Sequence, residues 1–205
     1  MSDLNGRKVE LPSRATAWQP CMIATESIGE GTNIGALSHI GQNVTVGVNC
    51  RVQGSVYIAD GCLIGSEVFI GPNATLTNDR YPPSGGNWSP VVVEDKVVIG
   101  ANATIIAGVR LYSGCIIAAG AVVTKDVPAD QVWAGNPATF LMTKNEYQKL
   151  YFYKMILITG STGFVGMNLL KKLSEGNSKI IALYRSEQKK RLVEKFLKSS
   201  KSTNK

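Results

Sequence analysis

A six-residue repeat is the feature of the sequence that most restricts its fold. From Ile28 the chain can be cut into eight consecutive hexads, IGEGTN to IGPNAT, and the same register resumes at Val93 for six more. A large aliphatic residue opens every hexad, and a small residue occupies the fifth position. A period of six fits neither an α-helix nor a simple alternating strand, so the repeat predicts a short strand and a turn, many times over.

Three hexads would form one 18-residue coil of a triangular prism, with the aliphatic side chains inside and Gly, Asn or Asp in the turns. Stacked coils would bury one another's aliphatic residues and pair their backbones. The fold class is therefore all-β, a parallel β-helix, since an antiparallel sandwich would not keep this register over fourteen hexads. Cys50, Cys62 and Cys115 take the fifth position, which predicts small core residues rather than ligands or disulfide partners.

Residues 77–92, TNDRYPPSGGNWSPVV, interrupt the repeat. The pairs Pro82-Pro83 and Gly85-Gly86 are incompatible with continued coil pairing, so this segment is expected to leave the prism as a loop. Loops on rigid scaffolds commonly carry function, which makes this loop the first place to look for a site.

The hexads and the ending AAGAVVTKDVPADQVWAGNPA, residues 118–138, resemble the hexapeptide-repeat acyltransferases over about residues 22–142. The resemblance implies a left-handed β-helix, a homotrimer with its active sites between subunits, and acetyl-CoA as cosubstrate. The stretch VFIGPNATLTNDRYPPS, which leads into the loop, is similar to nucleotide-sugar 3-N-acetyltransferases. The implied acceptor is the amine of a dTDP- or UDP-linked amino sugar.

Transfer of an acyl group from a thioester needs a neutral amine or an activated hydroxyl, close approach and donors for the oxyanion. By the resemblance, Asn78 lies beside the sugar amine, and its amide oxygen could accept a hydrogen bond from that amine. Asp79 could take the proton or hold a sugar hydroxyl. The alternative is a sugar O-acetyltransferase in which His39, the single histidine, is the general base.

Other residues are candidates for holding the two substrates. Gly100, Ala101, Ala118 and Ala119 are small enough for close approach of the pantetheine arm, and Arg110 and Lys125 could meet the CoA phosphates. Arg80 could meet the nucleotide's diphosphate, and Tyr81 and Trp88 could stack on a sugar or base, although packing of the loop against the prism is equally compatible. No metal site is expected: a zinc enzyme of the γ-carbonic-anhydrase type would have to gather three copies of His39. A non-catalytic scaffold also stays open.

The stretch MILITGSTGFVG, which begins at Met155, resembles the start of extended short-chain dehydrogenases, with Gly160, Gly163 and Gly166 as the dinucleotide fingerprint. Only a β-α-β unit and a basic helix are expected to follow, without a second mononucleotide half. We therefore expect no NAD binding. Residues 155–205 are interpreted as a fused or truncated beginning of a neighbouring protein.

The positive charge is unevenly distributed: residues 154–205 hold 12 lysines and arginines against 3 acidic residues, and the remainder holds 10 against 12. A nucleic-acid binder would not divide its charge in this way. No signal peptide or membrane-spanning run is apparent, so a cytoplasmic protein without nucleic-acid or membrane partners is expected. The expected divisions are a lead-in (1–21), the β-helix (22–142), a linker (143–154) and the partial α/β unit (155–205).

Overall fold

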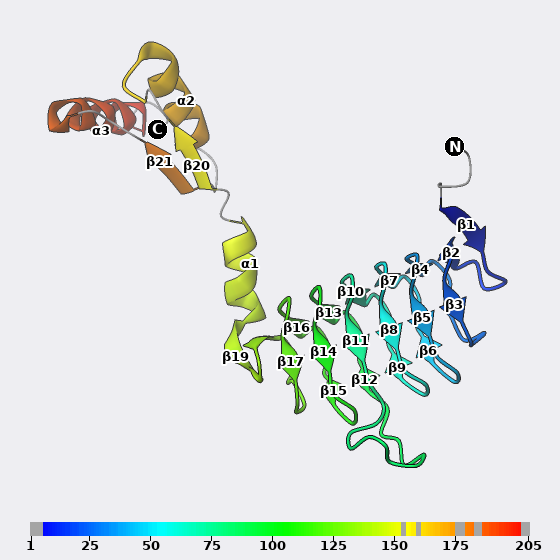
Figure 1. Cartoon of the computed structure of the whole chain (residues 1–205). Coiled ribbons are helices and arrows are strands. Elements are labelled where there is room, and N and C mark those ends of the chain that lie inside the picture. The colour runs from blue at the N-terminus through cyan, green and yellow to red at the C-terminus, as the bar shows by residue number, and fades with distance from the viewer. Residues whose placement is uncertain (1–5, 153–154, 159–160, 175–178, 183–185, 202–205) are drawn as a thin grey trace. The chain divides into compact units, whose positions relative to one another are not determined.

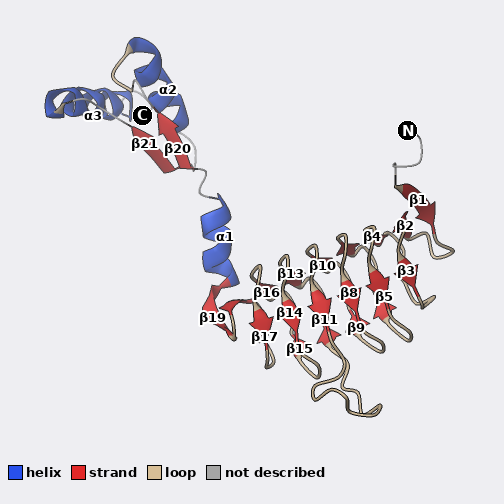
Figure 2. Cartoon of the chain, in the orientation of Figure 1, coloured by secondary structure: helices blue, strands red, loops and turns tan. Residues whose placement is uncertain are grey.

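The computed structural model describes residues 6–152, 155–158, 161–174, 179–182 and 186–201. The chain divides into two compact units, Met1–Asn145 and Glu146–Lys205. The first unit consists of short strands joined by turns, whereas the second contains both strands and helices (Figure 2).

The first unit is a parallel β-helix whose coils contribute strands to three sheets (Figure 1). The nine-stranded sheet has the order β1 (Arg7–Glu10), β2 (Thr16–Gln19), β4 (Asn33–Ile34), β7 (Arg51–Val52), β10 (Phe69–Ile70), β13 (Val98–Ile99), β16 (Ile116–Ile117), β18 (Gln131–Gly135) and β19 (Ala138–Thr143). The six-stranded sheet has the order β17 (Val122–Val123), β14 (Thr104–Ile105), β11 (Thr75–Leu76), β8 (Tyr57–Ile58), β5 (His39–Ile40) and β3 (Met22–Ile23). The four-stranded sheet has the order β15 (Arg110–Leu111), β12 (Val92–Val93), β9 (Leu63–Ile64) and β6 (Thr45–Val46).

The register between coils confirms the predicted 18-residue period and the predicted interruption. Tyr57 pairs with Thr75, and Thr104 pairs with Val122, in each case 18 residues along the chain. Thr75, however, pairs with Thr104, 29 residues along. The loop therefore adds eleven residues to one coil without shifting the strands on either side out of register.

The core of the β-helix contains the residues that the repeat predicts. Every aliphatic residue at a first position is buried, from Ile28 to Val123, and so are the occupants of the fifth position. Cys50, Cys62 and Cys115 are fully buried free thiols, as predicted. Burial raises the pKa of Cys62 to about 11 and that of Cys115 to about 12, so both stay protonated at neutral pH.

Two different constraints select the small residues at the corners. Asparagines in the turns adopt positive φ, between 55° and 59° at Asn43, Asn49, Asn73 and Asn102, as the repeat predicts. The glycine at the second position has another reason. A Cβ on Gly47 would lie 2.6 Å from the carbonyl carbon of Gly65 on the next coil. Glycine there lets neighbouring coils approach closely.

Antiparallel strand pairs close both ends of the nine-stranded sheet. At the start β1 pairs with β2, and at the other end β18 pairs with β19. β2 also pairs in parallel with β4, through Thr16 and Asn33. The first coil therefore begins within residues 1–21, the segment that the sequence predicts to be a lead-in.

The second unit has the predicted β-α-β order followed by a helix. Its elements are β20 (Met155–Ile158), α2 (Phe164–Ser174), β21 (Lys179–Ala182) and α3 (Glu187–Lys201), and β20 pairs in parallel with β21. Ile158, Leu170 and Val193 form its small core. Gly163 precedes α2 and Gly166 is buried within it, whereas Gly160 lies outside the described residues. Helix α1 (Lys144–Phe152) spans the division between the units.

None of the helices in the described part of the chain is long and apolar enough to cross a membrane.

The alternation along β9 gives a matched test of the core. Ile64 is 3% exposed and its neighbour Leu63 is 47% exposed. We expect Ile64→Ala to lower the free energy of unfolding by about 2–5 kcal/mol, because it leaves a cavity between coils. Leu63→Ala should cost less than about 1 kcal/mol. Denaturant unfolding followed by tryptophan fluorescence measures both, because all three tryptophans, Trp18, Trp88 and Trp133, belong to the β-helix. Equal losses would contradict the assignment of inward and outward positions.

Candidate functional site

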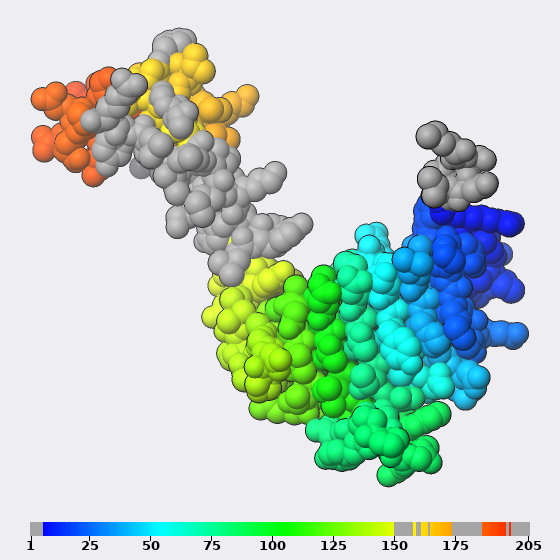
Figure 3. Space-filling view, in the orientation of Figure 1, coloured from blue at the N-terminus to red at the C-terminus, as the bar shows by residue number. Residues whose placement is uncertain are grey.

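The loop leaves the β-helix after β11, at the corner between the six-stranded and four-stranded sheets, and forms a projection from its surface (Figure 3). The base of the loop is closed by a hydrogen bond from the Ser89 backbone N–H to the Asn78 carbonyl oxygen, at 2.7 Å. Asn78 therefore lies at the junction of the rigid coil and the loop, where the side chain is half-buried.

The amide of Asn78 is held by the preceding coil. Its Nδ2 donates to the backbone carbonyl oxygen of Asp60 at 3.2 Å. Asp60 lies 18 residues earlier, at the same corner one coil away. Because the nitrogen is occupied as a donor, the Oδ1 atom is the end of the amide that can accept from a ligand.

Asp79 organises the loop. Its Oδ1 accepts from the Tyr81 N–H at 3.1 Å and its Oδ2 accepts from the Ser84 N–H at 2.9 Å. The bonds from Ser84, with a further contribution from Tyr81, hold the pKa of Asp79 below its ordinary value. A carboxylate with a lowered pKa is a weak proton acceptor. The geometry thus favours a structural role over the predicted catalytic one.

Arg80 fastens the loop to later coils. Its Nη1 donates to the carbonyl oxygen of Ala107 at 3.0 Å and its Nη2 donates to that of Thr124 at 3.1 Å. These two bonds attach the loop to later coils and leave further N–H donors of the exposed guanidinium unassigned. The predicted contact of Arg80 with a diphosphate stays a prediction.

The two loop aromatics are open to solvent: Tyr81 is 79% exposed and Trp88 is 52% exposed. Neither is packed into the β-helix core. Their predicted stacking on a sugar or base therefore stays a prediction.

His39 lies on β5, in the six-stranded sheet, and does not reach Asn78 within one chain. It pairs with Tyr57, which in turn pairs with Thr75. Asn78 is three residues beyond Thr75, at the corner, so His39 is two coils away. The imidazole stacks instead on Tyr57, with ring centroids 4.8 Å apart and an interplanar angle of 20°.

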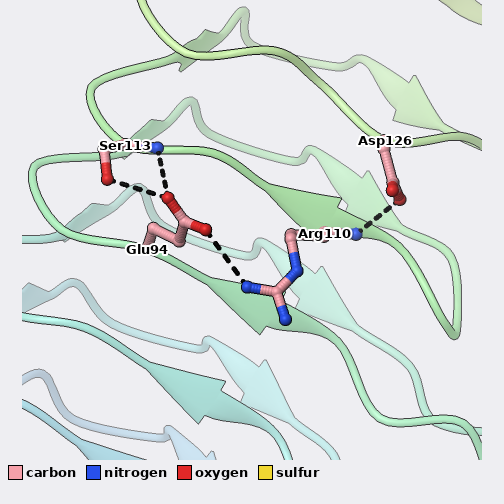
Figure 4. Close-up of polar contacts among 4 residues, drawn as sticks. All are labelled: Glu94, Arg110, Ser113 and Asp126. Atoms are coloured by element: carbon pink, nitrogen blue, oxygen red, sulfur yellow. Dashed lines mark hydrogen bonds and ion pairs between the residues drawn. The ribbon is translucent and has the colours of Figure 1, made fainter.

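Arg110, predicted to meet a CoA phosphate, is bound by its own chain (Figure 4). Its Nη1 lies 3.1 Å from Glu94 Oε1, and its backbone N–H donates to Asp126 Oδ1 at 2.8 Å. Glu94 Oε2 also accepts from the hydroxyl and the N–H of Ser113. The Ser113 hydroxyl, then its N–H and Arg110, lower the pKa of Glu94. Arg110 is therefore paired on the four-stranded face and is a weaker candidate than Lys125.

Lys125 lies directly after Thr124, the residue that anchors Arg80, and on the corner that carries Asn78. Its Nζ is 5.2 Å from the centroid of the Trp133 ring. The side chain is exposed, which leaves the ammonium accessible to an anion.

The small residues predicted to receive pantetheine occupy the other corner of the six-stranded sheet. Gly100 and Ala101 follow β13, and Ala118 and Ala119 follow β16 one coil later. A Cβ on Gly100 would clash with the backbone nitrogen of Ala119, so coil stacking accounts for this glycine. Within one chain, the full width of the six-stranded sheet separates this corner from Asn78.

A cavity of ≈ 420 Å³ lies at the N-terminal end of the β-helix, beside Leu11, Ile23 and Ile28, away from the loop. Within the described residues, no three His, Cys, Asp or Glu side chains gather in a way that could hold a metal ion.

The 18-residue register, written out from the sequence, would have found two residues that our sequence reasoning missed. Asp60 precedes Asn78 by one period, and Tyr57 follows His39 by one period. The backbone acceptors of Arg80 carry no such signal, because any residue supplies a carbonyl oxygen.

The role of Asp79 predicts how the loop responds to pH. Its folded-state pKa is lowered, so its contribution to loop order is present above the ordinary Asp value of about 3.9 and is lost as the pH falls through the folded-state value. Asp79→Asn should loosen the loop even at pH 7, because an amide cannot accept at both ends. Limited proteolysis between pH 3 and pH 7 measures this. Equal cleavage of the variant and the wild type at pH 7 would contradict the assignment.

Comparison with known proteins places this geometry in context. Residues 27–59, 39–72 and 90–125 match the family described as hexapeptide repeat of succinyl-transferase. Residues 158–204 match the family described as male sterility protein. A 2,3,4,5-tetrahydropyridine-2,6-dicarboxylate N-acetyltransferase of Staphylococcus aureus (strain JH9) is 51% identical over 79 residues, which are 38% of this chain and 32% of that protein. The chain thus spans about a third of the length of the curated relatives that it matches.

Two solved structures have a similar fold. The acetyltransferase domain of PglB from Neisseria gonorrhoeae FA1090, in complex with acetyl coenzyme A, has a TM-score of 0.55 at 23% identity and covers 63% of this chain and 58% of that chain. A mutant of AntD, an N-acyltransferase from Bacillus cereus, in complex with dTDP and coenzyme A, has a TM-score of 0.51 at 16% identity. The match covers 66% of this chain and 89% of that chain. The β-helix of this chain thus contains matches to the hexapeptide-repeat family and has a fold similar to that of the PglB acetyltransferase domain.

Proposed function

We propose that the chain is an N-acetyltransferase that transfers the acetyl group of acetyl-CoA to the amine of a nucleotide-linked amino sugar, in the cytoplasm. The observation that carries the proposal is the orientation of Asn78. Its amide nitrogen donates to the Asp60 carbonyl, which leaves Oδ1 as the end of the amide that can accept from a ligand, beside a loop held by Asp79. A fixed acceptor of this kind suits an amine that needs orientation more than it needs a strong base.

The reaction requires little of the protein beyond positioning. The amine nitrogen attacks the thioester carbonyl carbon, the new C–N bond forms and the C–S bond breaks. The CoA sulfur leaves with the electron pair and takes up the proton that the amine releases. Asn78 Oδ1 accepts one N–H of the amine, so that the nitrogen lone pair can face the thioester. Lys125 is the proposed partner of a CoA phosphate.

The comparisons support N-acyl transfer from acetyl-CoA as the reaction. The Staphylococcus aureus relative is an N-acetyltransferase, and the PglB domain binds acetyl coenzyme A. AntD, an N-acyltransferase, binds dTDP together with coenzyme A. The choice of an amino-sugar acceptor rests, in addition, on the similarity of the segment around Asn78 to nucleotide-sugar 3-N-acetyltransferases.

We further propose a homotrimer with intersubunit sites. Asn78 and the small residues Gly100 and Ala118 occupy different corners of one chain, on the two sides of the six-stranded sheet. A neighbouring copy that presents one corner opposite the other would bring acceptor and donor together. This arrangement accounts for the separation of the two candidate groups.

A second candidate acceptor follows from the identity to the Staphylococcus aureus enzyme. That relative is named for a tetrahydropyridine dicarboxylate, so a small cyclic dicarboxylate is the competing acceptor. Sugar O-acetylation with His39 as base is not favoured, because the Staphylococcus aureus relative and AntD are named as N-acetyl- and N-acyltransferases and because His39 stacks on Tyr57, two coils from the loop of its own chain.

A substrate screen tests the proposal directly. We expect free CoA thiol to appear when acetyl-CoA is incubated with dTDP- or UDP-amino sugars, and not with tetrahydropyridine-2,6-dicarboxylate. Asn78→Ala should lower kcat/KM by about 5- to 100-fold, because one hydrogen bond to the reacting amine is lost. Asn87→Ala, at an exposed asparagine of the same loop, is the matched control and should retain activity. Failure of every amino sugar to react would exclude the proposed acceptor.

A second variant separates N-acetylation from the base-catalysed alternative. At saturating acceptor, His39→Ala should keep kcat within about threefold of the wild type and leave the shape of its pH profile unchanged. A general base would contribute about 10²- to 10⁴-fold. A loss of that size, together with loss of the acidic limb of the pH profile, would assign the base to His39.

A further inference from the structure

The strands of the six-stranded sheet, among them β5, β8, β11, β14 and β17, follow one another along the β-helix (Figure 1). Their outward side chains form one row along its axis. The register places Met22, His39, Tyr57, Thr75, Thr104 and Val122 in this order, one coil apart. Two planar rings, His39 and Tyr57, stack within the row at 4.8 Å. This distance is one strand spacing, so the rings follow the repeat of the coils.

The stack ends abruptly at Tyr57. His39 covers one face of the tyrosine ring, and the next position on the other side is Thr75, followed by Thr104. A threonine side chain is too short to cover an aromatic ring. Tyr57 is accordingly 44% exposed. A planar group above Thr75 would continue the stack.

This open ring face lies close to the proposed reaction. Thr75 and Asn78 belong to the same coil and are three residues apart, which corresponds to about 10 Å of extended chain. In a nucleotide-linked sugar, a ribose and a diphosphate separate the base from the sugar. An acceptor with its amine at Asn78 could therefore extend across the six-stranded sheet and bring its base to the row.

We propose that the His39–Tyr57 stack is the binding platform for the nucleobase of the acceptor, with the base above Thr75 and against the open face of Tyr57. The inference rests on the proposed function, which it extends by assigning the nucleotide end of the substrate. Base–aromatic stacking supplies the affinity. The hydroxyls of Thr75 and Thr104, one coil apart on the same row, offer donors and acceptors to the edge of the base. This assignment gives His39 a binding role in place of a catalytic one.

Binding of free nucleotide tests the platform apart from catalysis. Calorimetric titration of the full chain with dTDP and with UDP should show that Tyr57→Ala weakens binding by about 5- to 100-fold. Tyr57→Phe should bind within about twofold of the wild type, because the ring is kept. Leu63→Ala is the matched control, since Leu63 is an exposed side chain of similar accessibility on the four-stranded sheet. Wild-type protein that binds neither nucleotide, or Tyr57→Ala that binds as well as the wild type, would overturn the platform.

Turnover with two acceptors separates this inference from the proposed function. Tyr57→Ala should raise KM for a nucleotide-linked amino sugar and leave kcat/KM for the corresponding amino sugar 1-phosphate unchanged. Equal losses with both acceptors, or a changed oligomeric state by light scattering, would overturn the platform and make the stack a structural contact. If the sugar phosphate is acetylated but no nucleotide binds, the proposed acetyltransferase function stands and the nucleobase platform is excluded. If nucleotide binds in a way that depends on Tyr57 but no acceptor is acetylated, the platform stands and the proposed function is excluded.

Discussion

The contact between successive coils is the constraint on which the rest of the molecule depends. No coil can bury its own aliphatic side chains or satisfy its own backbone, so each relies on the coils on either side at a strand spacing of about 4.8 Å. That short distance explains the glycine of the second position, where a Cβ would meet the backbone of the next coil, as at Gly47. It also arranges outward side chains in rows, so that residues one coil apart in the sequence become neighbours on the surface, as His39 and Tyr57 do.

The fold could be predicted from the sequence because each hexad carries the same pattern of buried, small and turn residues. Fourteen hexads agree on what is buried, and the buried cysteines and the turn asparagines follow from the same register. The interruption at residues 77–92 is visible for the same reason. The handedness comes from the resemblance alone. The pairing of β2 with β4 could not be predicted, because β2 lacks the hexad pattern.

The site was harder to predict, because it depends on which partners a polar side chain finds in three dimensions. The sequence makes Arg80 and Arg110 equally good candidates for binding phosphate. In the structure Arg80 is bonded to two carbonyl oxygens of its own chain, and Arg110 is paired with Glu94. A backbone carbonyl acceptor cannot be recognised in a sequence, because every residue has one. Glu94 lies 16 residues before Arg110, so the sequence does not show them as neighbours. Asn78, by contrast, can be selected from the sequence because it lies where the repeat is interrupted. Its partner Asp60 lies one 18-residue period earlier.

The added length in one coil has a consequence for how such proteins diversify. Thr75 still pairs with Thr104, so the coils on either side keep their register although eleven residues more than in an ordinary coil lie between them. Stability and recognition are thereby separated: the core is defined by the coils, and the loop can change in length and composition without disturbing it. A coil of this kind can therefore carry a segment of different length or composition at this corner, while the strand pairing on either side stays as it is.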